Sequence, residues 1–228
     1  MTFTIKDFNV CSVNINVLCK QCQHYYSQMN SYHHGNLKKE LLDCALKMCE
    51  RDGYTKLSIR SLAKESNVSQ TAPYRHFKTK ESLLAEVSKR GFDELTKRMS
   101  EALNKENNAL SLEDQFLEMG LAYLEFGVEK RNIYDLMHSP SIQKADFPEL
   151  LESAGGAFDV LVKILMKLHP EINEDQLSQK CMKYWAMMHG LIGILDIKPN
   201  SPTESDAAKA MINTKKDLRA FLKETIDF

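Results

Sequence analysis

Apolar residues recur at intervals of three and four along almost the whole chain from residue 36 onward. This spacing places them on one side of successive α-helices, and no stretch shows the strict alternation of a half-buried strand. Ser, Thr, Asn and Pro stand where helices would start, and Gly stands where one would end. We therefore predict an all-α protein with helices at 36–52, 58–66, 69–76, 79–104, 111–126, 133–137, 148–168, 177–197 and from 201 to the C-terminus.

The segment from Ser58 to Phe77 is the most informative part of this pattern. Ser58 can cap one short helix, Asn67 interrupts it, and Ser69 can cap a second helix directly afterwards. The second helix is too polar to serve packing alone, although Phe77 behind it suits the core. Two short helices joined by a tight turn form a helix-turn-helix, whose second helix enters the major groove of DNA.

The side chains of the second short helix suit contacts with DNA. Gln70 can read adenine with a donor and an acceptor, and Arg75 can bind guanine or phosphate. Thr71 and Ala72 are small enough to let the backbone approach the base edges. Pro73 falls at the fourth helical position, where it removes only the first intrahelical hydrogen bond. We predict that phosphates are contacted by Tyr74, His76 and Lys80.

The charge distribution separates the chain into two parts. The net charge of −1 does not by itself favour a nucleic-acid partner. Residues 33–80, however, hold 10 Lys and Arg against 5 Asp and Glu, whereas residues 81–228 hold 18 against 25. The helix-turn-helix block is therefore basic and the remainder acidic, a layout typical of a DNA-binding domain attached to a second domain.

Cysteines are concentrated near the N-terminus. Cys19 and Cys22 have the spacing of a zinc pair, with Cys11 and His24 nearby, but no second pair follows at zinc-finger distance. We predict no metal site, no disulfide framework and a reduced, cytoplasmic setting. Residues 1–30 do not have the pattern of a signal peptide, and we expect a disordered extension or an upstream start codon assigned in error.

Two adjacent histidines, His33 and His34, lie just before the first helix. They point in different directions in any regular backbone, and no third ligand accompanies them, so we assign them to an arm near phosphate rather than to a metal. The chain also lacks a nucleophile elbow, a phosphate-binding glycine loop and paired carboxylates in a defined context. We predict that it is not an enzyme and that it needs no cofactor.

Several motifs at fixed spacing resemble the TetR/AcrR family over residues 32–85. They are Tyr32-His33-His34-Gly35-Asn36-Leu37, Gly53-Tyr54-Thr55-Lys56-Leu57-Ser58-Ile59-Arg60, Val68-Ser69, Pro73-Tyr74-Arg75-His76-Phe77, Lys80-Glu81 and Leu83-Leu84. A second, shorter similarity, Trp185-Ala186-Met187-Met188-His189-Gly190, resembles the Trp-His-Gly signature of one C-terminal subgroup. Pro73 departs from the aliphatic residue that the family usually has there.

The resemblance implies a homodimeric regulator, most often a repressor, that leaves a palindromic operator when a small molecule binds. It implies a helix-turn-helix domain over 31–80 and a helical effector-binding and dimerisation domain over 81–228, with dimer contacts through about 174–197 and 203–226. Leu191, Ile192, Ile194, Leu195, Leu218 and Leu222 exceed what one small bundle needs to bury, which agrees with a dimer. The implied DNA contacts are Thr55, Ser58, Arg60, Ser69, Gln70, Thr71, Ala72, Tyr74, Arg75, His76 and Lys80.

The effector pocket is less well marked. Trp185 and His189 lie four residues apart on one helix face, where they line either a pocket or simply the core. Gly190 beside them is expected to permit close helix packing. The candidate pocket residues are Tyr123, Phe126, Met137, His138, Trp185, Met188 and His189.

Three functions remain open at this point. The first is a ligand-responsive dimeric repressor. The second is an activator or a ligand-independent regulator with the same DNA-binding domain. The third is a protein-interaction module, which the basic block over residues 33–80 disfavours. The effector, the operator and the regulated genes are not encoded in any motif of the chain.

Overall fold

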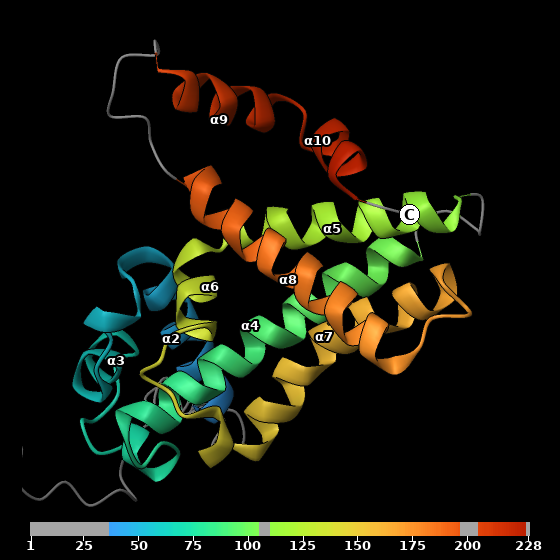
Figure 1. Cartoon of the computed structure of the whole chain (residues 1–228). Helices are drawn as coiled ribbons and strands as arrows, with labels where there is room; N and C mark the ends of the chain where they lie inside the picture. Colours follow the sequence, from blue (N-terminus) through green and yellow to red (C-terminus); the bar gives the residue numbers. More distant parts are fainter. Residues whose placement is uncertain (1–36, 105–109, 197–204, 227–228) are drawn as a thin grey trace, which may run out of the picture. The chain divides into compact units, whose positions relative to one another are not determined.

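The computed structural model describes residues 37–104, 110–196 and 205–226. These ranges contain α-helices and short 3-10 turns and no β-strand, as the hydrophobic pattern predicts (Figure 1). None of their helices combines the length and apolar character needed to cross a membrane. The expectations for residues 1–30 and for His33 and His34 lie outside the described residues.

The helices begin and end close to the predicted positions. They are α2 (Leu37–Asp52), α3 (Ile59–Glu65), α4 (Lys80–Leu103), α5 (Leu112–Glu129), α6 (Arg131–Met137), α7 (Pro148–Leu168), α8 (Glu174–Asp196), α9 (Asp206–Lys216) and α10 (Leu218–Thr225). The 3-10 turns are η2 (Tyr54–Lys56), η3 (Pro73–Arg75) and η4 (Lys144–Asp146).

A small N-terminal domain is built from α2, α3 and η3. Its core is apolar and closed, with Leu41 and Leu62 fully buried and Phe77 only 1% exposed, which places Phe77 in the core as predicted. α2 ends at Asp52, and Gly53 follows it with a φ of 80°, which favours glycine. Its ψ of 151° lies outside the αL region, because the chain leaves the helix in an extended direction.

The long helix α4 connects this domain to the rest of the chain. Thr79 caps it in a reciprocal arrangement with Ser82, which fixes its first turn. Its 24 residues span about 36 Å, and α5, α6 and α7 all pack along it (Figure 1). Ion pairs from Lys38 to Glu86 (2.5 Å) and between Arg90 and Asp43 tie α2 to its first half.

The larger domain packs α4, α5, α7 and α8 around a common interior. α5 and α8 approach closely at Gly127, because a Cβ atom added there would overlap Ile192. Gly155 and Gly156, which interrupt the helical propensity of 148–168, stay inside a continuous α7. α8 starts three residues before the predicted 177, after the cap Asn173, whose Oδ1 accepts a hydrogen bond from the Gln176 amide N–H (2.9 Å).

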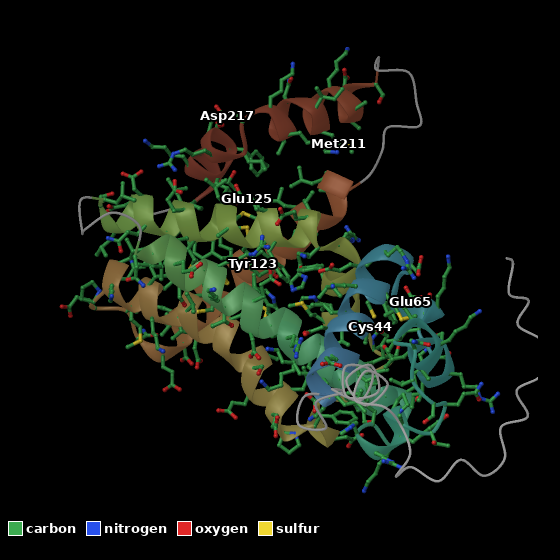
Figure 2. All side chains as sticks on the ribbon, turned by 180° about the vertical axis from the view of Figure 1, so that it is seen from behind. Cys44, Glu65, Tyr123, Glu125, Met211 and Asp217 are labelled. Carbon is green, nitrogen blue, oxygen red and sulfur yellow. The ribbon has the colours of Figure 1, made fainter. Side chains whose placement is uncertain are left out.

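The last predicted helix is in fact two helices. α9 and α10 meet at Asp217, which has non-helical backbone angles and accepts a hydrogen bond from the Ala220 amide (2.8 Å), so that it caps α10 (Figure 2). Ion pairs from Arg219 to Asp114 (2.9 Å) and Glu118 then hold α10 against α5. The proposed start at 201–202 lies outside the described residues, and the described helix begins after the cap Ser205.

Part of the compositional argument for a dimer is wrong. Six apolar residues were predicted to exceed what one protomer can bury, but four of them are buried within the protomer: Leu191, Ile192, Leu195 and Leu222. The hydrophobic pattern could not reveal this, because α10 folds back onto α5 and α8 packs on α5. Leu218 is half-buried, and Ile194 is 44% exposed. Gly190 has nothing within 4 Å of an added Cβ, so it permits no close helix packing inside the protomer.

Candidate nucleic-acid interface and ligand cavity

The turn after α3 is fixed by local hydrogen bonds. Asn67 adopts a left-handed conformation with φ of 52°, which asparagine tolerates better than most residues. Its amide donates to Lys64 O (3.2 Å), and the Val68 amide donates to Ala63 O (3.0 Å). These two bonds form a Schellman motif, which ends α3 sharply and turns the chain toward the next element.

The element after this turn is shorter and tighter than the predicted helix over 69–76. Its bonds run from the Ala72 amide to Ser69 O (3.0 Å) and from the Arg75 amide to Ala72 O (3.2 Å), which is the 3-10 pattern. Pro73 has no amide hydrogen to donate, and this removes the α-helical bond that would reach Ser69. A turn over residues 69–76, centred on η3, therefore replaces the expected α-helix. Because the predicted base contacts lie on it, we call it the reading turn.

Pro73 lies on the inner side of this turn. Its ring is buried, whereas the side chains around it remain in solvent. Tyr74 is 48% exposed, a high value for a tyrosine beside a closed core. Ala72 is half-buried, and the remaining predicted contact residues of the turn are exposed: Ser69, Gln70, Thr71, Arg75 and His76. The surface formed by residues 69–76 is polar and continuous along the turn.

The other predicted DNA contacts lie close to α3 and α4. Thr55, Ser58 and Arg60 are exposed, and Lys80 is half-buried. The Lys80 ammonium donates to Thr55 O (3.1 Å), which links η2 to the start of α4. The Ser58 hydroxyl is engaged in a capping box with Ser61, so its first role is to cap α3.

Two arginines on this surface are not neutralised by neighbouring side chains. Neither Arg60 nor Arg75 makes an ion pair within the described ranges, whereas Arg51 is held by Glu65 (2.9 Å) and Asp52 (2.8 Å). An exposed arginine without a carboxylate partner is available for a phosphate or a base edge. The geometry therefore offers a cationic, polar face at 55–80.

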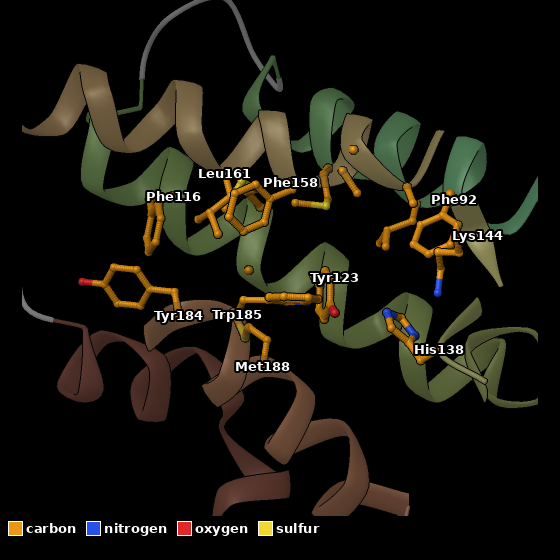
Figure 3. A pocket seen from close by; sticks show the side chains of 17 residues that line it. Phe92, Phe116, Tyr123, His138, Lys144, Phe158, Leu161, Tyr184, Trp185 and Met188 are labelled. Atoms are coloured by element: carbon orange, nitrogen blue, oxygen red, sulfur yellow. The ribbon is translucent and has the colours of Figure 1, made fainter. Parts of the chain in front are cut away.

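A second candidate site lies inside the larger domain. It is a cavity of about 420 Å³ among α4, α5, α7 and α8, with His138, which follows α6, and Lys144 of η4 at one end (Figure 3). Most of its walls are apolar or aromatic. The lining residues are Phe92, Leu95, Met99, Phe116, Met119, Gly120, Tyr123, His138, Lys144, Ala154, Gly155, Ala157, Phe158, Leu161, Tyr184, Trp185 and Met188.

The structure brings four of the seven candidate pocket residues to this cavity: Tyr123, His138, Trp185 and Met188. Phe126 lies instead in the core beneath the Arg98 guanidinium, and Met137 packs against Gly91. His189 lies beside the cavity, with its ring 5.2 Å from that of Trp185. The three residues outside the lining have the same helical spacing as the lining residues, so only the packing of the helices decides which of them reach the cavity.

Sequence reasoning missed most of the cavity wall. Aromatic and methionine residues such as Phe92, Phe158 and Met99 occupy inward helix positions, where they cannot be distinguished from ordinary core residues. Lys144 lies in the short η4 turn, where a lysine is expected to face solvent. No signal in the sequence indicates that its ammonium reaches an interior site.

A hydrogen-bonded cluster lies at the polar end of the cavity. The Tyr134 hydroxyl lies 3.1 Å from the Tyr123 hydroxyl and 2.5 Å from His189 Nδ1. The His138 ring nitrogen lies 3.0 Å from Tyr134 O. Burial lowers the pKa of His138 to about 4 and also lowers the pKa of His189. Both imidazoles are therefore neutral near pH 7.

The described cysteines do not gather with these histidines. Cys44, Cys49 and Cys181 carry free thiols. In the part of the chain that the structure describes, no three His, Cys, Asp or Glu side chains come together as metal ligands would.

Two family models match the chain. Residues 41–87 match the model described as bacterial regulatory proteins of the tetR family, and residues 116–209 match a tetracyclin repressor-like C-terminal domain. The chain belongs to the TetR family. It is therefore a transcription regulator with a helix-turn-helix DNA-binding domain, not an enzyme. The Trp-His-Gly subgroup is not confirmed by these matches and stays a prediction.

Individual relatives are distant from this TetR-family chain. An uncharacterized HTH-type transcriptional regulator, YobS, from Bacillus subtilis is 24% identical over 101 residues, which are 44% of this chain and 51% of that protein. The chain thus matches about half the length of this relative.

Two solved structures have the same fold. A protein of unknown function from a Rhodococcus species is 24% identical, with a TM-score of 0.63 over 84% of this chain and 98% of that one. The TetR family transcriptional regulator PfmR from Thermus thermophilus is 18% identical, with a TM-score of 0.54 over 79% of this chain and 97% of that one.

In this TetR-family protein, α6 contacts both the DNA-binding domain and the hydrogen-bonded cluster beside the cavity. The Asn132 side chain donates to Glu50 O (2.8 Å) at the end of α2, and Lys130 pairs with the Glu50 carboxylate (2.6 Å). The Tyr54 hydroxyl donates to Ser139 Oγ (3.1 Å) just after α6. The same helix carries Tyr134, in the hydrogen-bonded cluster beside the cavity.

Proposed function

We propose that this protein is a cytoplasmic repressor that binds a palindromic DNA operator as a homodimer and leaves it when a small molecule occupies the cavity. The observation that carries the proposal is the position of α6. It has hydrogen bonds to the DNA-binding domain, and its Tyr134 hydroxyl also lies within hydrogen-bond distance of Tyr123, which lines the cavity, and of His189 beside it. A ligand that displaces α6 would therefore change the position of the DNA-binding domain.

The proposed DNA contacts follow from exposure and chemistry. Gln70 and Arg75 would read base edges, because they are exposed on the reading turn and carry the donors and acceptors that adenine and guanine match. Tyr74, His76 and Lys80 would contact phosphates and so position the turn without specifying a sequence. Pro73, buried behind this surface, would hold the turn in its tight conformation.

The proposed route of release runs through the hydrogen bonds of α6. A ligand between α5 and α8 would press on Tyr123 and His138, both of which contact Tyr134. A shift of α6 would then be transmitted to Glu50 and Tyr54 at the base of the DNA-binding domain. Packed interiors respond to a small displacement by moving whole helices, which makes such a transmission physically reasonable.

The proposed dimer surface is the outer face of α8. Met182 (55% exposed) and Ile194 (44% exposed) lie on it together with Ala186 and Gly190, at helical spacing. An added Cβ at Gly190 or Gly193 meets nothing within the protomer, which leaves space for a partner helix. This face replaces the buried leucines as the basis for the homodimer.

A footprint on the DNA beside the protein's own gene tests the operator. We expect protection of an inverted repeat with half-sites one or more helical turns apart, as a two-fold dimer requires. Binding should weaken steeply with salt, because phosphate contacts release counterions. Protection without two-fold symmetry, or binding that is insensitive to salt, would contradict the proposal and favour a protein-interaction module.

The role of α6 can be tested with a matched pair of asparagines. Asn132→Ala removes the hydrogen bond to Glu50 O, and Asn104→Ala removes a similar bond to Ser100 O at the far end of α4. We expect the first variant to bind both DNA and cavity ligands but to release DNA less completely when a ligand binds. The second variant should behave as the wild type. Equal release by both variants would argue against transmission through α6.

A further inference from the structure

The cavity has two chemically different ends. Phe116 and Tyr184 form one end, with their rings 5.1 Å apart, and the Tyr184 hydroxyl points away from the cavity (Figure 3). Lys144, His138 and Phe92 form the opposite end (Figure 3). Between them lie Phe158 and Trp185, whose rings are 5.8 Å apart. A molecule that fits this space has an apolar body and one polar end.

The polar end carries one formal charge. Lys144 is the only ionised side chain among the lining residues, since His138 is neutral near pH 7 and no Asp or Glu belongs to the lining. No carboxylate forms an ion pair with the Lys144 ammonium within the described ranges, and the ammonium lies over the Phe92 ring at 5.9 Å. Burial lowers the pKa of Lys144, which shows that its environment disfavours the unpaired cation.

An anion beside Lys144 would remove this penalty. A half-buried ammonium pairs more strongly with a carboxylate than a fully hydrated one does, because the local dielectric is lower. A lysine presents a single point charge, whereas phosphate groups are more often held by arginine forks or by several cations. One lysine in an otherwise apolar cavity therefore matches one negative charge.

We propose that the ligand of this cavity is a hydrophobic monocarboxylic acid, whose carboxylate pairs with the Lys144 ammonium while its apolar body lies between Phe158 and Trp185. This inference rests on the proposed function, in which the cavity holds the effector. It adds the chemical class of that effector. The volume of about 420 Å³ lies within the range of pockets that hold drug-sized molecules.

The test uses three probes that share one chain and differ in their head: decanoate, 1-decanol and decylamine. Trp185 is the only tryptophan of the chain and lines the cavity, so its fluorescence reports binding directly. We expect decanoate to bind about 10- to 100-fold more tightly than decanol, since a charge-assisted hydrogen bond adds about 1.5–3 kcal/mol to binding. Decylamine should bind most weakly of the three.

Lys144→Met removes the charge and keeps most of the length of the side chain. We expect this variant to bind decanoate about 10- to 100-fold less tightly than the wild type and decanol less than about twofold less tightly. Lys144→Arg should restore the preference for the acid. Lys163→Met removes an exposed charge from α7 outside the cavity and serves as the control, with affinities equal to those of the wild type. Circular dichroism checks that each variant is folded.

Three outcomes would overturn the inference: decanol binding as tightly as decanoate, an equal loss of both in Lys144→Met, or binding of none of the probes. A parallel assay of operator release separates this inference from the proposed function. If decanol or decylamine releases the operator and decanoate does not, the ligand class is wrong and the release mechanism stands. If decanoate binds through Lys144 and the operator stays bound, the class stands and the release mechanism is wrong.

Discussion

The reading turn and the cavity differ in where their candidate site residues lie, on the surface in one and in the interior in the other. At residues 69–76 the apolar groups, Pro73 and the adjoining Phe77, face inward and the polar side chains face solvent. At the cavity the candidate site residues face the interior of the larger domain, and the cavity walls are made of the same residue types as the core. A surface site is therefore marked by polar residues that packing does not need, whereas an interior site carries no such mark.

The largest effect is expected where the interior has no spare room. Gly127→Leu would force a side chain into Ile192 of α8, and overpacking of this kind costs about 3 kcal/mol of unfolding free energy. Gly190→Leu, on the outer face of α8, should leave the protomer's stability almost unchanged but weaken the proposed dimer. Urea denaturation and sedimentation measure the two effects. Similar stability losses in both variants would show that the outer face is not open.

A second effect distinguishes the cavity from the surface by its response to acid. The pKa of His138 is about 4 in the folded chain against an ordinary value of 6.5, so the unfolded state binds a proton first. Stability should therefore be lost as the pH falls from about 6.5 to about 4, by up to about 3 kcal/mol. His138→Gln should lose less over the same range. Melting temperatures of the variant and the wild type, followed against pH, would contradict this account if the two curves ran parallel.

A third prediction separates two roles within the reading turn. Gln70→Ala should relax the preference at one base position by about 1–3 kcal/mol. Tyr74→Ala should weaken binding to every DNA sequence equally, because a phosphate contact carries no sequence information. Competition binding with single-base operator variants measures both. If both substitutions act equally on every sequence, the division of roles is wrong.

The smallest effect concerns the backbone that orients this turn. Asn67→Ala places a residue with a Cβ and no local polar group in the left-handed region, at a cost of about 1 kcal/mol. Asn67→Gly should be nearly neutral, since glycine adopts this conformation freely. Thermal unfolding compares the two variants. A larger loss for glycine would show that the Asn67 side chain, rather than its φ, matters.

Most features of this fold that depend on neighbouring residues were predictable from the sequence, and those that depend on distant contacts were not. The helix starts at Ser58, Thr79 and Ser111 were predictable, because caps act within one turn of a helix. The helix over 69–76 was not predicted correctly, because the missing amide of Pro73 converts it into a 3-10 turn. The prediction of a single helix over 203–226 was also wrong, because Asp217 caps a new helix that Arg219 holds against α5.

The sequence by itself determined the helical class, the family and the polar character of residues 69–76, since these depend on spacing, caps and residue types close together in the chain. Only the tertiary structure decided which inward residues leave a cavity and which fill the core. Tyr123 and Phe126 lie three residues apart on α5, yet the first lines the cavity and the second is enclosed beneath Arg98. Lys144 reaches the cavity from a turn far from α8 in the sequence. Such differences arise from the fit between distant helices, which local patterns do not encode.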